Sequence, residues 1–329
     1  MAFIKKILGS TLIAAIAAGG YFAYWAQKPI IGDEVEPIEF SIAPGSGAHA
    51  AGQQIAEAGV PMAPLLFNLL ARVTAKSGKL KAGAYELKPG TTPLRLIEQL
   101  VRGEFAQESL TIIEGWTFRQ MRQAMAVHRG LKHDTIAMSD KEVMAAIASD
   151  YRQPEGLFFP DTYLFAKGSS DLQIFRQAHA MLLTHLSEAW DKRDPALPYK
   201  TPYEALTMAS IVEKETGQKS ERGMIAGVFV NRLKLGMLLQ TDPTVIYGMG
   251  NRYDGKIHKK DLETDTPYNT YTRTGLPPTP IALPGVQSLT AALAPAKTPA
   301  LYFVSKGNGS SQFSDNLSDH NRAVNQYQR

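Results

Sequence analysis

Length, composition and charge exclude several classes of protein. The chain has 329 residues, of which 44% are apolar and 20% charged. This composition is typical of a globular protein, and the length suffices for about two domains. The chain contains no cysteine, which excludes a disulfide framework, a thiolate zinc site and a cysteine nucleophile.

The small basic excess lies at the N-terminus. The net charge is +4, from 35 basic and 31 acidic residues. Residues 1–30 contain Lys5, Lys6 and Lys28 and no acidic residue, which leaves 35 − 3 = 32 basic and 31 acidic residues for the rest of the chain. Because that remainder is nearly neutral, it has no electrostatic reason to attract a phosphate backbone, and we expect no nucleic-acid partner.

The first segment is apolar. From Ile7 to Gln27 the chain carries 21 uncharged residues between flanking lysines. As a helix this run would extend about 30 Å, the thickness of a bilayer core. We therefore predict a cytoplasmic N-terminus at residues 1–6, a single transmembrane helix at 7–27 that anchors the protein in the inner membrane, and a linker at 28–37. The rest would be periplasmic. The alternative is a cleaved signal peptide.

Residues 38–104 predict a small α+β module. Strand-like segments at Ile38–Ile42 and Tyr85–Leu87 each precede a glycine-containing turn and a helical stretch. An amphipathic helix is expected between them at about Ala63–Ala75, and a further helix at Pro93–Arg102. The resulting order is β-α-α-β-α. Such a module either supports the rest of the chain or binds glycan, and the pattern does not decide between the two.

The remaining residues, 105–329, contain an aromatic segment without regular structure. Two prolines and a glycine prevent a helix in Pro154-Glu-Gly-Leu-Phe-Phe-Pro-Asp-Thr-Tyr163. Loops rarely carry such rings unless the rings pack or bind something. The segment is therefore expected either to pack or to bind something.

One helix carries two carboxyl groups near its end. Thr201-Pro-Tyr-Glu204 is a capping box with proline at the first helical position, and the helix is expected to run to about Thr216. Glu213 and Glu215 fall on the two borders of its buried face, in the last turn, where the helix dipole disfavours negative charge. A half-buried carboxyl there should keep its proton to a higher pH, as a general acid requires. Periodicity does not choose between them, and a solvated helix end is the alternative.

Polar loops follow a second helix, which is expected at about Ser220–Lys234 and contains Asn231. The loops Gln240–Thr244, Asp265–Tyr271 and Gly275–Pro280 are rich in amides, hydroxyl groups and tyrosine. Aromatic faces suit sugar rings, and planar amides suit hydroxyl and acetamido groups, so the loops favour carbohydrate binding. The alternative is ordinary turn chemistry.

Signatures of other chemistries are missing. The sequence has no HExxH, GxSxG or GxxxxGKS motif, and its seven histidines include no pair with helical metal-ligand spacing. We therefore expect no metal and no cofactor. What is left is carboxylate chemistry on a polar, aromatic site.

Several segments resemble one protein family in the same order. They are Glu155–Tyr163, Ala209–Thr216 (ASIVEKET), Leu239–Tyr247 (LQTDPTVIY), Tyr268–Tyr271, Gly275–Pro278, and the closing Phe313 with His320-Asn321. The chain closely resembles the endolytic murein transglycosylases, the MltG or YceG-like family, over essentially its whole length. The resemblance implies an α+β fold with an N-terminal membrane helix, a LysM-like subdomain, here residues 38–104, and a catalytic domain, here residues 105–329.

The resemblance also implies a reaction. The substrate would be the peptidoglycan glycan strand, cut internally between N-acetylmuramic acid and N-acetylglucosamine to leave a 1,6-anhydromuramyl end, which terminates or trims nascent strands. The essential glutamate of the family falls on Glu215, which would act first as general acid and then as general base. Peptidoglycan synthases are candidate protein partners. The candidate substrate-binding residues are Asn231, Gln240, Asn269 and Tyr271, with Glu155, Asp161 and Tyr163 around them.

Two alternatives stay open at this point. One is a muramidase that hydrolyses the same bond, with Glu155 or Asp161 as a second carboxylate. The other is a membrane-tethered scaffold that binds peptidoglycan without cleaving it.

Overall fold

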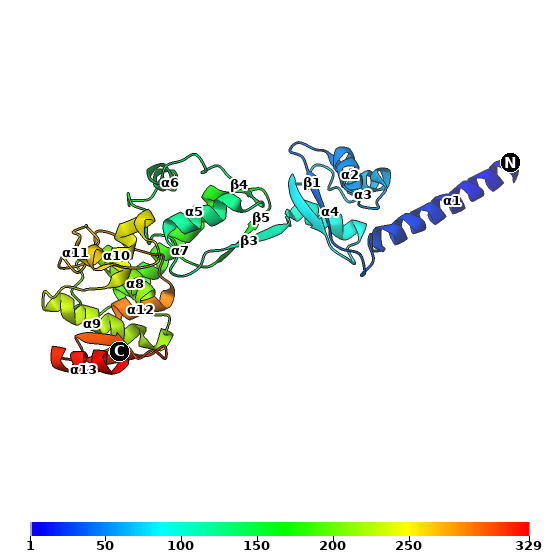
Figure 1. Ribbon diagram of the computed structural model, residues 1–329. Coiled ribbons are helices and arrows are strands. Elements are labelled where there is room, and N and C mark those ends of the chain that lie inside the picture. Colours follow the sequence, from blue (N-terminus) through cyan, green and yellow to red (C-terminus); the bar gives the residue numbers. More distant parts are fainter. Residues whose placement is uncertain (1, 329) are drawn as a thin grey trace. The chain divides into compact units, whose positions relative to one another are not determined.

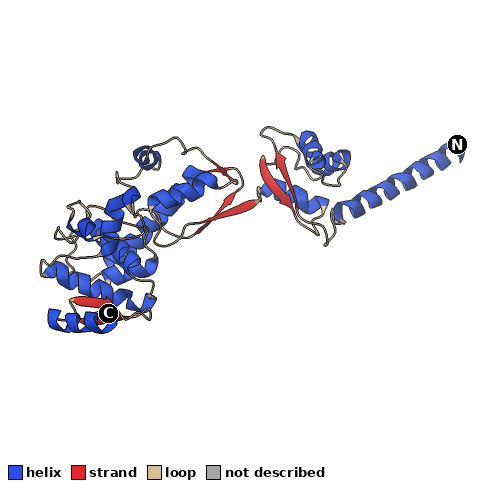
Figure 2. Cartoon of the chain, viewed as in Figure 1, coloured by secondary structure: helices blue, strands red, loops and turns tan. Residues whose placement is uncertain are grey.

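The structure is a computed structural model that describes residues 2–328. The described chain is α+β: helices predominate, and the strands form two-stranded sheets (Figure 1, Figure 2). The chain divides into two compact units. The first contains Met1–Glu108 and Leu164–Ser169, and the second contains Ser109–Tyr163 and Ser170–Arg329.

The N-terminal helix of the first unit, α1, spans Ala2–Gln27. Within residues 2–328, no helix combines the length and the apolar character that crossing a membrane requires. The transmembrane helix predicted at residues 7–27 is therefore not supported. The end of α1 instead belongs to the core of the first unit, where Ala26 is buried and Phe22 and Trp25 pack against it.

The core of the first unit is built on an antiparallel pair of strands. Strand β1 (Ile38–Ile42) pairs with β2 (Gly83–Leu87), so that Phe40 lies opposite Tyr85 with the two rings stacked at 5.6 Å. Alternate residues of both strands are buried, as expected for a sheet with one covered face. The helices of this core are α2 (Ala48–Glu57), α3 (Pro64–Val73) and α4 (Pro93–Arg102). This is the element order expected for residues 38–104.

The second unit is mainly helical. Its helices are α5 (Phe118–Val127), α6 (Asp140–Ala146), α7 (Asp171–Asp191), α8 (Pro202–Glu215), α9 (Arg222–Lys234), α10 (Asp242–Met249), α11 (Lys259–Glu263), α12 (Val286–Leu293) and α13 (Leu317–Tyr327), with short 3-10 turns at Lys219–Glu221 and Gly250–Arg252. Its C-terminal hairpin is β7 (Tyr302–Ser305) with β8 (Ser311–Ser314).

Two further strand pairs include residues at the boundaries of the two units. Strand β3 (Gln107–Thr111) pairs with β5 (Thr162–Ala166), and β4 (Leu131–Lys132) with β6 (Ser169–Ser170).

Helix α8 lies at the centre of this unit, against α7, α9, α10 and α12 (Figure 1). Every residue from 205 to 212 is buried, so the helix is covered on all sides and not on one face as its periodicity suggested. Its buried hydroxyl groups are satisfied: Ser210 donates to the carbonyl of Thr207 and accepts from the backbone N–H of Ile281. The helix ends at Glu215, one residue before the expected end at about Thr216, because Thr216 is extended.

The aromatic segment before α7 packs into the core. Phe158 stacks on Phe118 at 5.1 Å and meets Phe175 edge-on at 5.5 Å. Gly156 makes this packing possible, because its φ of +80° is left-handed and a Cβ there would lie 2.3 Å from the ring of Pro280. The rings of this segment therefore support the fold.

Candidate active site

Glu215, the last residue of α8, lines an open cavity of about 920 Å³ in the second unit. The walls come from α9, the segment before α10, the hairpin β7–β8 and α13. Polar and aromatic side chains dominate among the lining residues, which include Glu215, Arg232, Gln240, Asp242, Tyr271, Tyr302 and His320.

A fixed hydroxyl group holds the Glu215 carboxyl. Thr241 Oγ1 donates to Glu215 Oε2 at 2.6 Å. Thr241 is itself buried, and its backbone N–H donates to Thr270 Oγ1 at 3.0 Å. Thr244 Oγ1 in turn lies 2.9 Å from Thr270 Oγ1. Thr241 before α10, Thr244 within α10 and Thr270 in a later loop thus orient one carboxyl oxygen. Glu215 Oε1 has no partner among residues 2–328.

The surroundings of Glu215 favour its protonated form. Burial raises the pKa of Glu215 above its usual value of 4.5, and the nearby Asp242 carboxylate raises it further. The Thr241 hydroxyl group and the Arg232 guanidinium act in the opposite direction without cancelling the rise. A raised pKa is the property expected of a general acid, and burial is its main cause.

Two of the other predicted residues share this cavity. Gln240 is exposed and has a left-handed backbone with φ of 53°, and its N–H donates to the carbonyl of Thr270 at 3.1 Å. The Tyr271 hydroxyl group donates to Asp242 Oδ1 at 2.6 Å. Glu215, Gln240 and Tyr271 therefore line one cavity, although Glu215 and Tyr271 are separated by 271 − 215 = 56 positions in the sequence.

The two predicted asparagines do not line it, because their amides hold backbone. Asn231 Nδ2 donates to the carbonyls of Thr298 at 2.8 Å and Ala300 at 3.0 Å. Asn269 is 1% exposed, and its Nδ2 lies within 3.2 Å of three carbonyl oxygens in residues 261–264. The expectation that these are exposed loop amides is wrong for Asn269.

The Asn269 and Gln240 side chains are therefore expected to respond differently to truncation. Asn269→Ala removes a buried amide that bonds three part-buried backbone carbonyls and should lower the free energy of unfolding by about 1–3 kcal/mol. Gln240→Ala removes an exposed amide and should change the free energy of unfolding by less than about 0.5 kcal/mol. Urea unfolding of both variants tests this, and equal stabilities would contradict the assignment.

The three predicted residues of the aromatic segment also lie outside the cavity lining. Tyr163 is buried and donates to the carbonyl of Phe159 at 2.6 Å. Asp161 is exposed and accepts from the N–H of Thr162. Glu155 is buried and accepts from the Phe118 N–H at 2.9 Å and from the Tyr247 hydroxyl group at 3.0 Å. It thereby joins the start of α5 to α10.

Glu155 should make stability depend on pH. Burial raises the pKa of Glu155 to about 7 from 4.5. Between these two values the folded chain keeps a proton that the unfolded chain releases, so the free energy of unfolding falls with rising pH by about 3 kcal/mol in total. Glu155→Gln should remove this fall, since Tyr247 can turn its hydroxyl group to accept from the amide. Urea unfolding at pH 5 and pH 8 measures this fall in the free energy of unfolding. The same change between the two pH values in the variant and the wild type would contradict the role of Glu155.

The second glutamate of the α8 end has a different environment from Glu215. The Glu213 side chain is 5% exposed and forms an ion pair with Arg222 Nη2 at 2.9 Å, and its Oε2 accepts from the Gly285 N–H at 3.0 Å. It ties the end of α8 to the starts of α9 and α12. Glu213 therefore has a structural role, whereas Glu215 lines the cavity.

Comparison with known proteins places the chain in a family. A sequence model of the YceG-like family matches residues 40–326. The chain belongs to this family. A Bacillus subtilis relative named endolytic murein transglycosylase is 34% identical over 94% of this chain and 90% of its own length. A Streptococcus pneumoniae relative of the same name is 27% identical over 98% of this chain, which spans 64% of that relative.

A solved structure agrees with this placement. The crystal structure of a YceG-like protein from Listeria monocytogenes is 31% identical in sequence and superposes with a TM-score of 0.55. The superposition covers 87% of this chain and 99% of the Listeria chain. The matched region therefore includes residues of both compact units.

Several cavity residues were not singled out from the sequence. Thr241 and Asp242 stand inside the LQTDPT segment, and His320 stands in the closing motif, so the family-like segments already contained them. Arg232 follows the predicted residue Asn231 directly in the sequence. Tyr302 belongs to none of the segments that were singled out from the sequence.

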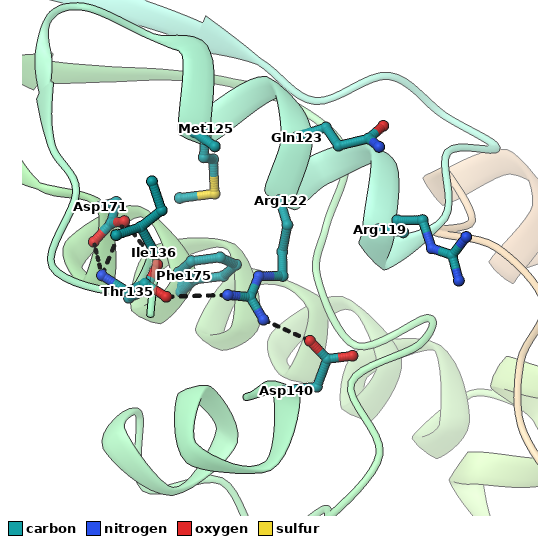
Figure 3. Close-up of a pocket in the computed structure, with 10 residues that line it drawn as sticks. Arg119, Arg122, Gln123, Met125, Thr135, Ile136, Asp140, Asp171 and Phe175 are labelled. Carbon is teal, nitrogen blue, oxygen red and sulfur yellow. Dashed lines mark hydrogen bonds and ion pairs between the residues drawn. The ribbon is translucent and has the colours of Figure 1, made fainter. Parts of the chain in front are cut away.

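A second cavity, of about 360 Å³, lies between α5, α6 and α7 (Figure 3). Its Arg122, Asp140 and Asp171 side chains bond to other residues of the cavity wall. Arg122 donates to Asp140 Oδ1 at 2.6 Å and to the carbonyl of Thr135 at 3.0 Å. The Asp171 carboxylate accepts from the N–H and the hydroxyl group of Thr135. The Glu215 cavity, which is lined by a carboxyl group of raised pKa, is therefore the candidate active site.

Proposed function

We propose that the chain is a lytic transglycosylase that cleaves the bond between N-acetylmuramic acid and N-acetylglucosamine within peptidoglycan strands and forms a 1,6-anhydromuramyl end. The observation that carries the proposal is Glu215: a half-buried carboxyl with a raised pKa on a large cavity lined by amide and aromatic groups. The names of the Bacillus and Streptococcus relatives support the same reaction class.

One carboxyl group suffices for both proton transfers. Protonated Glu215 gives its proton to the glycosidic oxygen as the bond from that oxygen to C1 of the muramyl unit breaks. The C6 hydroxyl group of the same sugar then attacks C1, and the Glu215 carboxylate takes up the hydroxyl proton. Thr241 donates to Oε2 throughout and leaves Oε1 for the transferred proton. The reaction consumes no water and regenerates protonated Glu215.

The cavity also informs the hydrolase alternative. Glycoside hydrolases commonly use two carboxylates that flank the bond. Neither Glu155 nor Asp161 lines the Glu215 cavity, so the two second carboxylates considered from the sequence lose their support. Asp242 does line it, with one oxygen accepting from Tyr271. A muramidase would therefore have to use Asp242 to activate water.

Product analysis tests the proposal. Purified full-length chain is incubated with glycan strands in water labelled with oxygen-18, and the products are analysed by mass spectrometry. The expected products carry anhydro ends and no label. Labelled reducing ends would contradict the transglycosylase and favour the muramidase, and intact strands that still bind the protein would favour a scaffold.

The same proposal implies a location and a partner class. An enzyme of this specificity works in the cell envelope, where its strands are made, and would terminate or trim nascent strands there. Peptidoglycan synthases are the proteins expected nearby. Crosslinking in intact cells, followed by identification of the captured proteins, tests the synthase expectation; capture of cytoplasmic proteins alone would contradict it.

A further inference from the structure

Arg232 is a buried cation on the wall of the Glu215 cavity. It projects from α9, and only 8% of its surface is exposed. Among the cavity-lining residues that the structure describes, no lysine and no second arginine occurs. No carboxylate in residues 2–328 lies within 4.0 Å of its nitrogen atoms. The positive charge of this wall is therefore concentrated on one unpaired guanidinium.

The bonds that Arg232 makes are all to neutral groups. Its Nε donates to the carbonyl of Leu301 at 2.7 Å, and its Nη1 donates to the carbonyl of Leu239 at 2.9 Å. A weaker contact joins Nη1 to Gln240 Oε1 at 3.4 Å. Within the described chain, Nη2 has no acceptor. The guanidinium also lies over the ring of Tyr302, 5.0 Å from its centroid.

No other titratable group that lines the cavity forms an ion pair with Arg232 within residues 2–328. Burial raises the pKa of Glu215, which keeps that carboxyl neutral to a higher pH. Asp242 is already bonded to the Tyr271 hydroxyl group. The His320 ring stacks on Tyr302 at 5.1 Å, and burial with the nearby Arg232 charge lowers the pKa of His320, so the imidazole tends to stay neutral.

A buried charge is costly unless an opposite charge meets it. Carbonyl groups and an aromatic face compensate a guanidinium only in part. The strongest partner for an open guanidinium nitrogen is a carboxylate, since charge-assisted hydrogen bonds are about twice as strong as neutral ones. The arrangement therefore fits a ligand that brings a carboxylate to the cavity.

We propose that Arg232 determines specificity by binding a carboxylate of the muramyl unit through Nη2. This inference rests on the proposed function. Muramic acid carries a lactyl carboxyl group, which is a free carboxylate in strands without stem peptides and an amide in strands with them. In peptide-bearing strands the stem supplies carboxylates further from the sugar. Arg232 would thus select strands by the charge next to the cleaved bond.

The first test changes the substrate and not the protein. Wild-type chain is given peptide-free strands, the same strands with their carboxylates converted to neutral methylamides, and peptide-bearing strands with and without that conversion. All new chain ends, anhydro and reducing, are counted. Neutralising the carboxylate that Arg232 binds should raise KM by about ten- to a hundredfold and change kcat less.

The four substrates separate the possible results. A rise in KM on neutralising peptide-free strands assigns the lactyl carboxylate, and a rise confined to peptide-bearing strands assigns the stem. An unchanged KM in both pairs would overturn the proposal while leaving the proposed function intact. Absence of new ends with every substrate would overturn the proposed function, and the Arg232 inference with it.

The second test uses variants with the same substrates. In Arg232→Gln, peptide-free strands should show the high KM that neutralised strands show with the wild type, and neutralisation should have no further effect. Arg232→Lys should recover part of the difference, since the charge returns without the planar fork. The control is Arg273→Gln, an exposed arginine paired with Asp265 outside the cavity, which should keep the wild-type KM ratio.

Discussion

Glu215→Gln is expected to abolish strand cleavage while the protein stays folded. General acid–base groups contribute about 10²–10⁴-fold to the rate, and because one group serves both half-steps here, the loss should reach or exceed the upper figure. The amide keeps the shape of the side chain, and its oxygen can still accept from Thr241. Release of anhydro-muropeptides, measured beside thermal unfolding, gives both quantities.

The pH dependence adds a second signature to the same variant. The folded pKa of Glu215 is raised, so protonation of this group stabilises the fold below its unfolded pKa, and the contribution is lost as pH rises through the folded value. The melting temperature of Glu215→Gln should therefore rise relative to wild type with increasing pH. Wild-type cleavage should fall over the same range as the acid loses its proton.

The control for this experiment is Glu188→Gln, on an exposed position of α7. It makes the same chemical change away from the cavity and should leave cleavage and melting temperature close to wild type. Substantial cleavage by Glu215→Gln would remove Glu215 from the mechanism, and equal loss in Glu188→Gln would show that the assay reports something other than this carboxyl group.

Local sequence signals predicted the elements well. Strand Ile38–Ile42 and helix Pro93–Arg102 have the expected bounds, because alternation, a proline at the first helical position and a following glycine act over a few residues. The α8 N-terminus was predictable for the same reason, since Thr201 caps it by accepting from the Glu204 N–H. Such patterns depend on neighbours in the sequence and need no knowledge of the tertiary structure.

Burial of polar side chains was not predictable in this way. Asn231 and Asn269 carry the planar amide group that suits sugar hydroxyl groups, but in the structure both amides bond to backbone carbonyls. For Asn231 these carbonyls lie 67 and 69 residues away, beyond any local pattern. Gln240, with the same amide, is exposed on the cavity. Which amide is free depends on where distant chain segments pass, and only the three-dimensional structure supplies that.

The two glutamates of α8 show the limit most directly. Periodicity places them symmetrically on the borders of one face, but the helix is buried on every side, so no face distinguishes them. The distinction comes from Arg222 and Gly285, which reach Glu213, and from Thr241, which reaches Glu215. Glu213 pairs with a cation and therefore has a structural role. Glu215 bonds only to a neutral hydroxyl group in the described chain and can therefore carry a proton.

Glu213→Gln should accordingly be one of the most destabilising single changes in the second unit. It leaves the Arg222 guanidinium, whose side chain is 6% exposed, without its buried counter-charge. Removing one partner of a buried ion pair costs about 3–5 kcal/mol. Urea unfolding at neutral pH measures the loss. Glu114→Gln is the matched control, because the Glu114 carboxylate lies 3.9 Å from the same guanidinium, is 42% exposed, and should contribute less than about 1 kcal/mol.

A double variant separates the charge effect from general disruption. Arg222→Met added to Glu213→Gln removes the unpaired cation and fills its space with an apolar side chain. A buried pair replaced in this way is often neutral, so the double variant should regain most of the stability that Glu213→Gln loses. The Arg222 Nε is buried without a partner in the described chain, which further reduces what the arginine contributes. Arg222→Met is also measured alone. If the losses of Glu213→Gln and Arg222→Met simply add in the double variant, the ion pair does not hold the α8 end. The position of Glu215 must then depend on Thr241 and the surrounding packing instead.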